Sequence, residues 1–116
     1  MNAEKEREKF LERAVRITPS IGARLVIEEG IYSRAPSKKE ENRFVASLDG
    51  EQRRTLMSIL QHERRSAIFD MLVQFHEAVV IDGWSLQKEG VPIPADRDDY
   101  TLFQDYLTKL TDEEEA

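Results

Sequence analysis

The sequence predicts a mainly α-helical fold of about five helices around a central buried helix, with one small β-hairpin before the last helix. Apolar residues recur with the period of an α-helix over most of the chain. The five glycines and four prolines interrupt this pattern at a few places, where helices are expected to begin and end. One segment, residues 84–94, lacks the helical period and has the composition of two short strands around a turn.

The first helix is expected over residues 3–16, where Phe10, Leu11 and Ala14 fall on one side. Residues 1–8 are mostly Glu, Lys and Arg, so we expect them to be frayed or disordered in solvent. The same expectation holds for residues 111–116, whose acidic side chains oppose the negative end of the last helix dipole. With 116 residues, the chain is expected to form a single helical domain, residues 1–116.

A second helix is expected after Thr18 and Pro19, because threonine caps helices and proline suits their first position. It should end at Gly30, since glycine adopts the left-handed conformation that commonly follows a helix. Residues 25–27 include β-branched side chains, which leaves a strand over 25–29 as an alternative.

Two further helices are expected from capping boxes, in which Ser, Thr or Asp is followed three residues later by Glu or Gln. Ser37 with Glu40 predicts a short helix, and Asp49 with Gln52 predicts the long helical segment that follows. The apolar pattern continues far enough that residues 50–82 form either one helix or two.

Within this segment, residues 67–81 are apolar on nearly all sides, and Gly83 marks their end. A helix of this kind is buried by its own chain or forms the seam of a dimer. We therefore expect residues 67–81 to be the central helix, covered either by the rest of the chain or by a second copy.

The hairpin is expected from two short apolar segments, residues 84–87 and 91–94, around a turn that contains glycine. The two prolines in the second segment restrict it to an edge strand. A last helix, capped by Asp98 or Asp99, is expected to run to about residue 110.

Composition excludes several classes of site. The chain has no cysteine, which excludes disulfides, thiolate nucleophiles and cysteine-based zinc sites, and which suits a reducing cytoplasm. The N-terminal residues lack the apolar core of a signal peptide, and no apolar run approaches the roughly 18 residues that a membrane helix needs. We therefore expect a cytoplasmic protein without a membrane partner.

Charge is unevenly distributed along the chain. Residues 1–65 hold 14 Lys and Arg against 11 Asp and Glu, a net charge of +3, whereas residues 66–116 hold 3 against 12, a net charge of −9. The overall charge of −6 makes nucleic acid an unfavourable partner. The asymmetry favours two parts that attract each other, within one chain or between two copies.

Arg64 is the first candidate binding residue. On a helical projection it falls in the apolar stripe between Leu60 and Ala67. A charged residue at such a position forms an ion pair, reaches solvent with the end of its long side chain, or marks a break in the helix. The functional alternative is that Arg64 binds an anion or a partner. Its candidate internal partners are Glu28, Glu29, Asp99 and Asp105.

His76 and Trp84 complete the candidate binding site. His76 lies in the most apolar stretch, where it is either a core histidine or a pocket-lining acid or base. A small-molecule site would bring Arg64 and His76 together with an aromatic residue, either Trp84 or Tyr100. No motif points to a catalytic residue or a cofactor, so neither is predicted, and a small-molecule ligand stays unknown.

Two patterns resemble known sites only in part. His62 begins a sequence similar to the zinc motif H-E-x-x-H, but Ser66 stands where the second histidine is needed, so no metal is predicted. Two arginine pairs, about three helical turns apart, would form either a phosphate-tracking stripe or a solvated face. They are Arg53, Arg54, Arg64 and Arg65.

Part of the chain resembles a small bacterial domain-of-unknown-function family. The similarity covers roughly residues 45–108 and rests on residues 48–56 (LDGEQRRTL), 63–70 (ERRSAIFD), 84–94 and 100–106. They contain a long helix with an internal Glu-Arg pair, a hairpin with an acidic residue and glycine, and an aromatic last helix. The resemblance implies this fold and a bacterial cytoplasmic origin, without a reaction, cofactor or catalytic residue.

The favoured function is a non-enzymatic protein-interaction or regulatory module that binds a protein partner or a second copy of itself. Its support is the uneven charge, the strongly apolar central helix and the lack of a catalytic set. A small-molecule binder or an enzyme with a pocket near Arg64 and His76 is the alternative, and a nucleic-acid binder comes third.

Overall fold

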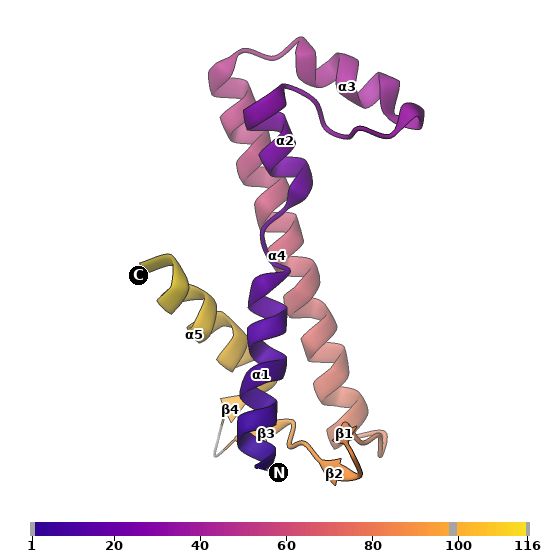
Figure 1. The fold of residues 1–116 in the computed structure, drawn as a ribbon, viewed down its shortest axis with the longest axis vertical. Coiled ribbons are helices and arrows are strands. Elements are labelled where there is room, and N and C mark those ends of the chain that lie inside the picture. The colour runs from indigo at the N-terminus through magenta and orange to yellow at the C-terminus, as the bar shows by residue number, and fades with distance from the viewer. Residues whose placement is uncertain (1, 98–99, 116) are drawn as a thin grey trace. The chain divides into compact units, whose positions relative to one another are not determined.

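The computed structural model describes residues 2–97 and 100–115, which form five α-helices, one 3-10 turn and two short strand pairs (Figure 1). In chain order these are α1 (Ala3–Arg16), α2 (Ile21–Glu29), η1 (Pro36–Lys38), α3 (Lys39–Ala46), α4 (Gly50–Val80), β1 (Gln87–Lys88), β2 (Val91–Pro92), β3 (Asp96–Arg97), β4 (Tyr100–Thr101) and α5 (Leu102–Glu115). The predicted class, mainly α with a small hairpin before the last helix, is confirmed.

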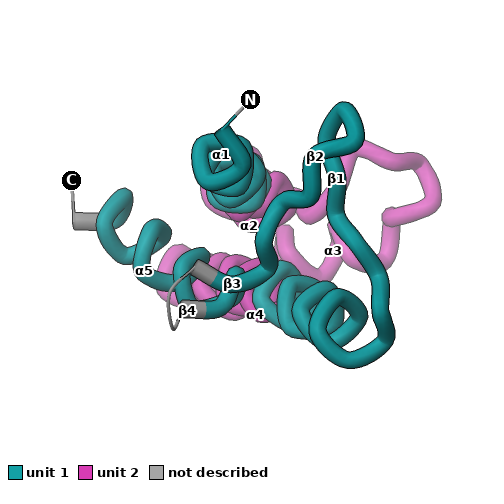
Figure 2. The backbone as a smooth tube through the Cα atoms, turned by 90° about the horizontal axis from the view of Figure 1, so that it is seen from below, with its two compact units in different colours: residues 1–17, 67–116 teal, residues 18–66 magenta. Residues whose placement is uncertain are grey.

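The chain divides into two compact units (Figure 2). Residues 1–17 and 67–116 form unit 1, and residues 18–66 form unit 2. Helix α4 contributes residues to both units. Whether the chain unfolds as the single domain expected from its length stays a prediction.

The main hydrophobic core belongs to unit 1, where α1 packs beside α5 (Figure 1). The buried residues of this cluster come from α1, α4, the segment before β3, and α5. They are Leu11, Ala14, Leu72, Ala95, Leu102, Tyr106 and Leu110. Burying a large aliphatic or aromatic side chain typically contributes about 1.5–3 kcal/mol, so these residues supply most of the driving force for folding unit 1.

A buried arginine ties α1 to the C-terminal part of unit 1. Arg7 is 2% exposed, and its Nε donates to the carbonyl oxygen of Pro94 at 3.1 Å. Nη2 donates to the carbonyl oxygen of Ala95 at 3.3 Å, and Nη1 donates to Asp105 Oδ2 at 2.6 Å. Arg7 lies within the charged run at residues 1–8, so this run supplies a core residue as well as surface.

The long helical segment is one helix and not two, because α4 continues without interruption through Gly50–Val80. Its end uses Gly83, whose φ of 79° lets the amide of Trp84 donate to the Ala78 carbonyl oxygen at 3.0 Å. A glycine at this place was expected from the sequence.

Residues 67–81 are less buried than the sequence predicted. Leu72 is buried, whereas Met71 is 61%, Val80 55% and Ile81 74% exposed. The first alternative, burial on all sides by the chain itself, is therefore wrong for this helix, and the second, the seam of a dimer, stays a prediction. In unit 1 the other elements cover one side of α4, and its remaining apolar side chains reach the surface.

The hairpin is confirmed, although its strands are shorter than expected. Strand β1 pairs with β2 in antiparallel register, with Lys88 opposite Val91. Glu89 and Gly90 form the turn with φ values of 51° and 79°, the positive values typical of a two-residue hairpin turn. A second antiparallel pair, β3 with β4, was not predicted.

The last helix begins later than predicted. Asp98 and Asp99, the expected caps, lie outside the described residues. Thr101 instead forms a capping box, in which its Oγ1 accepts from the Gln104 amide at 3.2 Å and Gln104 Oε1 accepts from the Thr101 amide at 3.0 Å. Tyr100 therefore belongs to β4 and not to the helix, and α5 continues to Glu115.

In unit 2, α2 is a helix throughout, which excludes the strand alternative, and it ends at Gly30 with φ 67°. Its cap is Ser20, whose Oγ accepts from the Ala23 amide at 3.1 Å, so the predicted start at Thr18 and Pro19 is two residues early. Serine has the same capping chemistry as threonine, so the kind of cap is as predicted and only its position differs.

The predicted caps of α3 and α4 have different outcomes. Asp49 and Gln52 form the expected capping box, with Asp49 Oδ1 accepting from the Gln52 amide at 2.8 Å. Ser37 lies inside η1, and α3 starts at Lys39 without a side-chain cap. The prediction for Ser37 is wrong because the chain enters α3 through a 3-10 turn, so this serine never takes the extended cap conformation.

Side-chain amides connect the elements of unit 2. Gln61 Nε2 donates to the Thr18 carbonyl oxygen at 2.8 Å, and its Oε1 accepts from the Ser20 amide at 3.0 Å. Asn42 Oδ1 accepts from the amides of Tyr32 and Ser33 at 2.8 and 3.0 Å. These bonds attach the segments on either side of α2 to α4 and α3.

Candidate functional site

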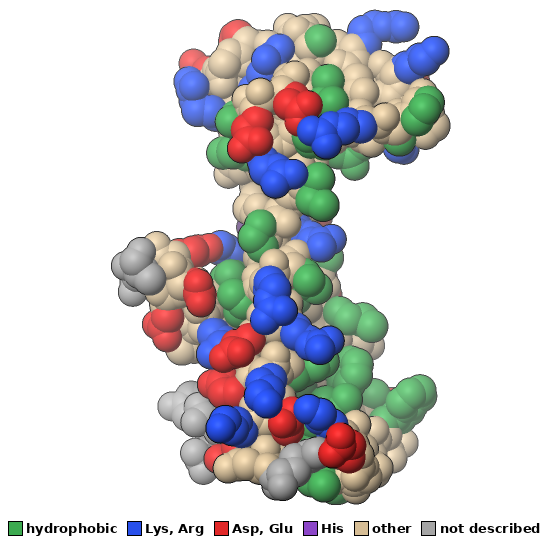
Figure 3. All heavy atoms as spheres, in the orientation of Figure 1, with side chains coloured by type: hydrophobic (Ala, Val, Ile, Leu, Met, Phe, Trp, Pro, Cys, Tyr) green, Lys and Arg blue, Asp and Glu red, His purple; other side chains and the backbone are tan. Residues whose placement is uncertain are grey.

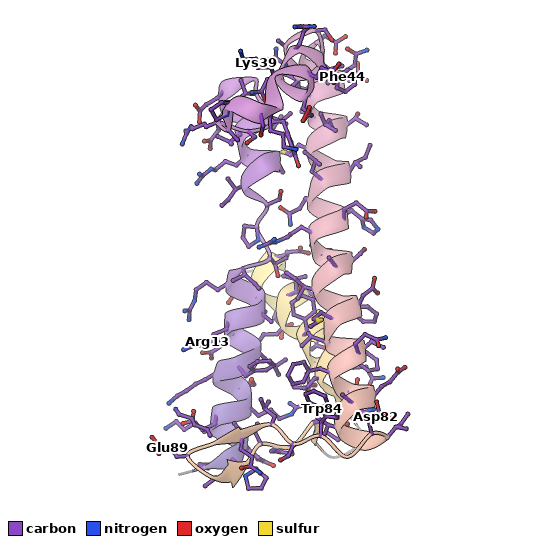
Figure 4. The ribbon with its side chains drawn as sticks, turned by 90° about the vertical axis from the view of Figure 1, so that its right-hand side faces the viewer. Arg13, Lys39, Phe44, Asp82, Trp84 and Glu89 are labelled. Carbon is purple, nitrogen blue, oxygen red and sulfur yellow. The ribbon has the colours of Figure 1, made fainter. Side chains whose placement is uncertain are left out.

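An apolar groove in unit 1, between α1 and the second part of α4, is the candidate binding surface. It has a volume of about 450 Å³, and we call it the α1–α4 groove. Its lining consists of Phe10, Arg13, Ala14, Arg16, Ile17, Ile68, Met71, Leu72 and Phe75. In Figure 4, α1 and α4 stand side by side with the side chains between them in view.

The groove follows from the helical spacing of apolar residues. On α1, Phe10, Ala14 and Ile17 recur at intervals of four and three residues and so share one face. On α4, Ile68 and Phe75 recur at the same seven-residue interval. The rings of Phe10 and Phe75 lie 6.0 Å apart between centroids and are tilted by 47°, which closes the floor of the groove.

Part of the groove is anchored in the core and part is open to solvent. Ala14 and Leu72 line the groove and also belong to the buried core cluster. Ile17 and Met71 line it with 53% and 61% of their surface exposed. The groove therefore combines a fixed floor with apolar edges that a partner could cover.

The α1 edge of the groove is basic. Arg13 and Arg16 line the groove and are exposed. Lys9, on the same flank of α1, lies 3.3 Å from Glu6 across one helical turn. Figure 3 shows Lys and Arg side chains along α1 with hydrophobic side chains beside them. This edge suits a ligand that carries carboxylates next to apolar groups.

Glu6 is the titratable group with a resolved shift near this surface. Lys88 Nζ donates to Glu6 Oε2 at 2.7 Å, and this hydrogen bond lowers the pKa of the Glu6 carboxyl below its ordinary value. Glu6 therefore stays ionised and pairs with Lys88 and Lys9. Arg13 and Arg16 lie outside these two pairs and are the cations that line the groove.

Arg64 lies in unit 2. The helix is continuous at this residue, so Arg64 marks no break, and its side chain is exposed. It lines a pocket of about 490 Å³ beside α2. The other lining residues are Ser20, Ile21, Gly22, Leu25, Tyr32, Ser33, Lys38, Leu60 and Glu63. Among the candidate partners of Arg64, Glu29 pairs with Arg34 and Asp105 pairs with Arg7.

His76 and Trp84 lie in unit 1. His76 Nδ1 is 3.1 Å from Asp96 Oδ1 without hydrogen-bond geometry, and the ring meets Phe103 edge-on with 5.5 Å between centroids. The imidazole is 19% exposed, which suits a residue at the border of the core. Trp84 is 71% exposed and follows the end of α4 (Figure 4). A pocket that joins these residues to Arg64 stays a prediction.

The arginine pairs of α4 differ in exposure. Arg54 and Arg64 are exposed, whereas Arg53 and Arg65 are half-buried. Arg53 Nη2 donates to the Ala46 carbonyl oxygen at 3.4 Å. A face on which two of the four arginines are half-buried is a weaker phosphate-tracking stripe than the sequence suggested.

The arginines of the groove edge were not among the residues singled out from the sequence. The sequence predicts part of the apolar lining, through Phe10 and Ala14 on one side of the first helix and through residues 67–81, for which cover by the chain and cover by a second copy are both open. A signal was present, because Arg13 and Arg16 border the Phe10–Ile17 line on a projection of α1. Sequence alone could not show that this side of the helix is open.

Sequence comparison now assigns the chain to a family. The family of unknown function DUF6547 matches residues 2–114. The chain belongs to this family. The match confirms the predicted resemblance to a family of unknown function and extends it from residues 45–108 to nearly the whole chain. Curated proteins and solved structures gave no match. Among the described residues, no helix of this DUF6547 member has both the length and the hydrophobicity for crossing a membrane.

Proposed function

We propose that the chain is a non-enzymatic protein-interaction module of the bacterial cytoplasm, with regulatory use, that binds a partner helix in the α1–α4 groove. The observation that supports this proposal is the groove itself: an apolar channel between two helices, with exposed Ile17 and Met71 and two arginines on one edge. Grooves of this kind receive the apolar face of an amphipathic helix.

The chemistry of the groove defines the partner. The floor of Phe10 and Phe75 accepts apolar side chains from one face of a helix. Arg13 and Arg16 attract carboxylates placed beside that face. The partner is therefore an amphipathic helix whose apolar face is flanked by Asp or Glu.

Site-specific photo-crosslinking in the source cells tests this function. A benzophenone amino acid replaces Met71, which is exposed in the groove. The matched control carries the same amino acid at Leu107, a residue of unit 1 that is 40% exposed and lies on α5. We expect a defined polypeptide adduct from position 71, absent at position 107.

The edge arginines provide the second arm of this test. Arg13→Glu with Arg16→Glu should remove the adduct from position 71, because the reversed charge repels an acidic partner. The function is contradicted if position 71 gives no polypeptide adduct in cells that contain the folded protein, or if the adduct persists unchanged in the double variant.

A second candidate function follows from Arg64. The pocket beside α2 places Arg64 and Lys38 with the hydroxyl-bearing residues Ser20 and Tyr32, a set that suits a small phosphate or carboxylate ligand. A titration with inorganic phosphate, followed by amide chemical shifts of unit 2, tests it. Arg64→Gln should abolish saturable shifts and Arg54→Gln should not; linear shifts in all three proteins would end this candidate.

A further inference from the structure

Helix α3 in unit 2 presents an aromatic side chain to solvent. Phe44 is 60% exposed, whereas the next residue, Val45, is 2% exposed and holds α3 in its unit. On a helical projection of α3, Phe44 falls between Glu40 and Glu41. All four residues line one shallow surface (Figure 4 labels Phe44), so the exposed aromatic ring is flanked by carboxylates.

The surface around Phe44 extends beyond α3. Tyr32, Leu56 and Leu60 line it as well, which gives Phe44 an apolar surround within unit 2. The carboxylate of Glu41 lies 3.6 Å from Lys38, and both side chains are more than 40% exposed, so this pair is weak and can be exchanged. We call this surface, centred on Phe44 with Glu40 and Glu41, the α3 surface.

The α3 surface has the chemistry required of the partner helix. The α1–α4 groove offers aromatic side chains and an arginine edge, and the α3 surface offers an exposed aromatic ring with an acidic flank. The local charges therefore favour contact between the arginine edge in unit 1 of one copy and the carboxylates of the α3 surface in unit 2 of another.

We propose that the occupant of the α1–α4 groove is α3 of a second copy of this chain, with Phe44 over Phe10 and Phe75 and with Glu40 and Glu41 at Arg13 and Arg16. The inference rests on the proposed function and names its partner. Each copy carries both surfaces, and a two-fold dimer that pairs them repeats the same contact twice.

Charge reversal with mixing of variants tests this inference. The mass in solution is measured by light scattering at low salt for the wild-type chain and for two variants. One is Arg13→Glu with Arg16→Glu; the other is Glu40→Lys with Glu41→Lys. The control is Lys39→Glu with Arg43→Glu, which makes the same change in charge as the first variant but on the adjacent face of α3.

The wild-type and control chains should have twice the mass of one chain. Each charge-reversed variant alone should have the mass of one chain, because like charges meet at both contacts. A mixture of the two variants should return to twice that mass, because each contact then joins opposite charges. Phe44→Ala should also halve the mass without altering any charge.

A monomeric wild-type chain at high concentration overturns the inference, as does a mixture that stays monomeric while both variants keep the helical circular dichroism of the wild type. If a charge-reversed variant loses its helical circular dichroism, the Phe44→Ala variant decides the test. A dimer mass that Phe44→Ala leaves unchanged contradicts the inference. If the chain is monomeric and position 71 still crosslinks to a different polypeptide, the proposed function holds and a second copy is excluded as the partner.

Discussion

The two units are stabilised in different ways. Unit 1 has a contiguous apolar core, and its buried Arg7 bonds to residues 87 to 98 positions away in the sequence. Unit 2 has fewer buried apolar residues, namely Ala23, Leu25, Val26 and Val45. It relies on the side-chain amides of Gln61 and Asn42, which bond across 43 residues or fewer.

This difference predicts which substitutions destabilise each unit. In unit 1 the ends of the chain must meet before Arg7 finds its partners, so its stability is concentrated in contacts between distant segments. In unit 2 the stability is distributed over hydrogen bonds between neighbouring segments, each contributing about 0.5–1.5 kcal/mol. Single substitutions should therefore damage unit 1 more than unit 2.

Arg7→Ala is expected to have the largest effect. It leaves Asp105, which is 12% exposed, without its guanidinium and removes the donors to two carbonyl groups. Loss of one partner from a buried ion pair costs about 3–5 kcal/mol. Urea unfolding measures this loss, and Glu12→Ala, on an exposed side of α1 outside the groove, should change stability by less than about 0.5 kcal/mol. Equal effects of the two substitutions would refute a structural role for Arg7.

Asn42→Ala should have an intermediate effect and should act in unit 2. Its side chain satisfies two amides and donates to the Ser33 carbonyl oxygen at 2.7 Å. Leaving such partly buried groups unpaired costs about 1–3 kcal/mol. Hydrogen exchange should speed up at the Tyr32 and Ser33 amides while the Leu11 amide in unit 1 keeps its protection. A uniform loss of protection would instead indicate that both units open together as one domain.

Ser20→Ala should cost about 1 kcal/mol, because it removes the cap of α2. The measurement is urea unfolding, with Ser58→Ala on the exposed face of α4 as the control. An unchanged midpoint would show that Ser20 is not the cap.

The smallest expected effect concerns Glu6 in unit 1. The pKa of Glu6 is lower in the folded chain than in the unfolded chain. Its ion pair therefore contributes fully to stability at a pH above the pKa of the unfolded chain, and this contribution is lost as the pH falls through the pKa of the folded chain. Lys88→Gln removes the main cause, so the pKa should rise toward its ordinary value of 4.5. Carboxyl carbon shifts during a pH titration report this directly, and an unaltered titration of Glu6 would contradict the assigned cause.

Local signals made the helices predictable from sequence. The first helix has its expected bounds of 3–16, Asp49 with Gln52 starts α4, and Gly30 and Gly83 end their helices. These features depend on residues a few positions apart, which a single sequence displays.

Features that depend on distant segments were not predictable in the same way. Arg7 shares a helical face with Leu11 and Ala14, but its burial requires the carbonyl groups of residues 94 and 95. The groove lining could be recognised as apolar, yet its exposure depends on which side of α4 the rest of unit 1 covers. A competing cap, as at Ser20 and Thr101, likewise shifts a helix start without changing the apolar pattern.

The central claim is that the α1–α4 groove of one copy holds α3 of another. Isotope-filtered nuclear Overhauser measurements on a mixture of copies test it most directly, with the Met71 methyl group labelled in one copy and the Phe44 ring protonated only in the other. The account predicts intermolecular cross-peaks between Met71 and Phe44, lost in Arg13→Glu with Arg16→Glu. A sample without these cross-peaks, whether monomeric or dimeric, would contradict it.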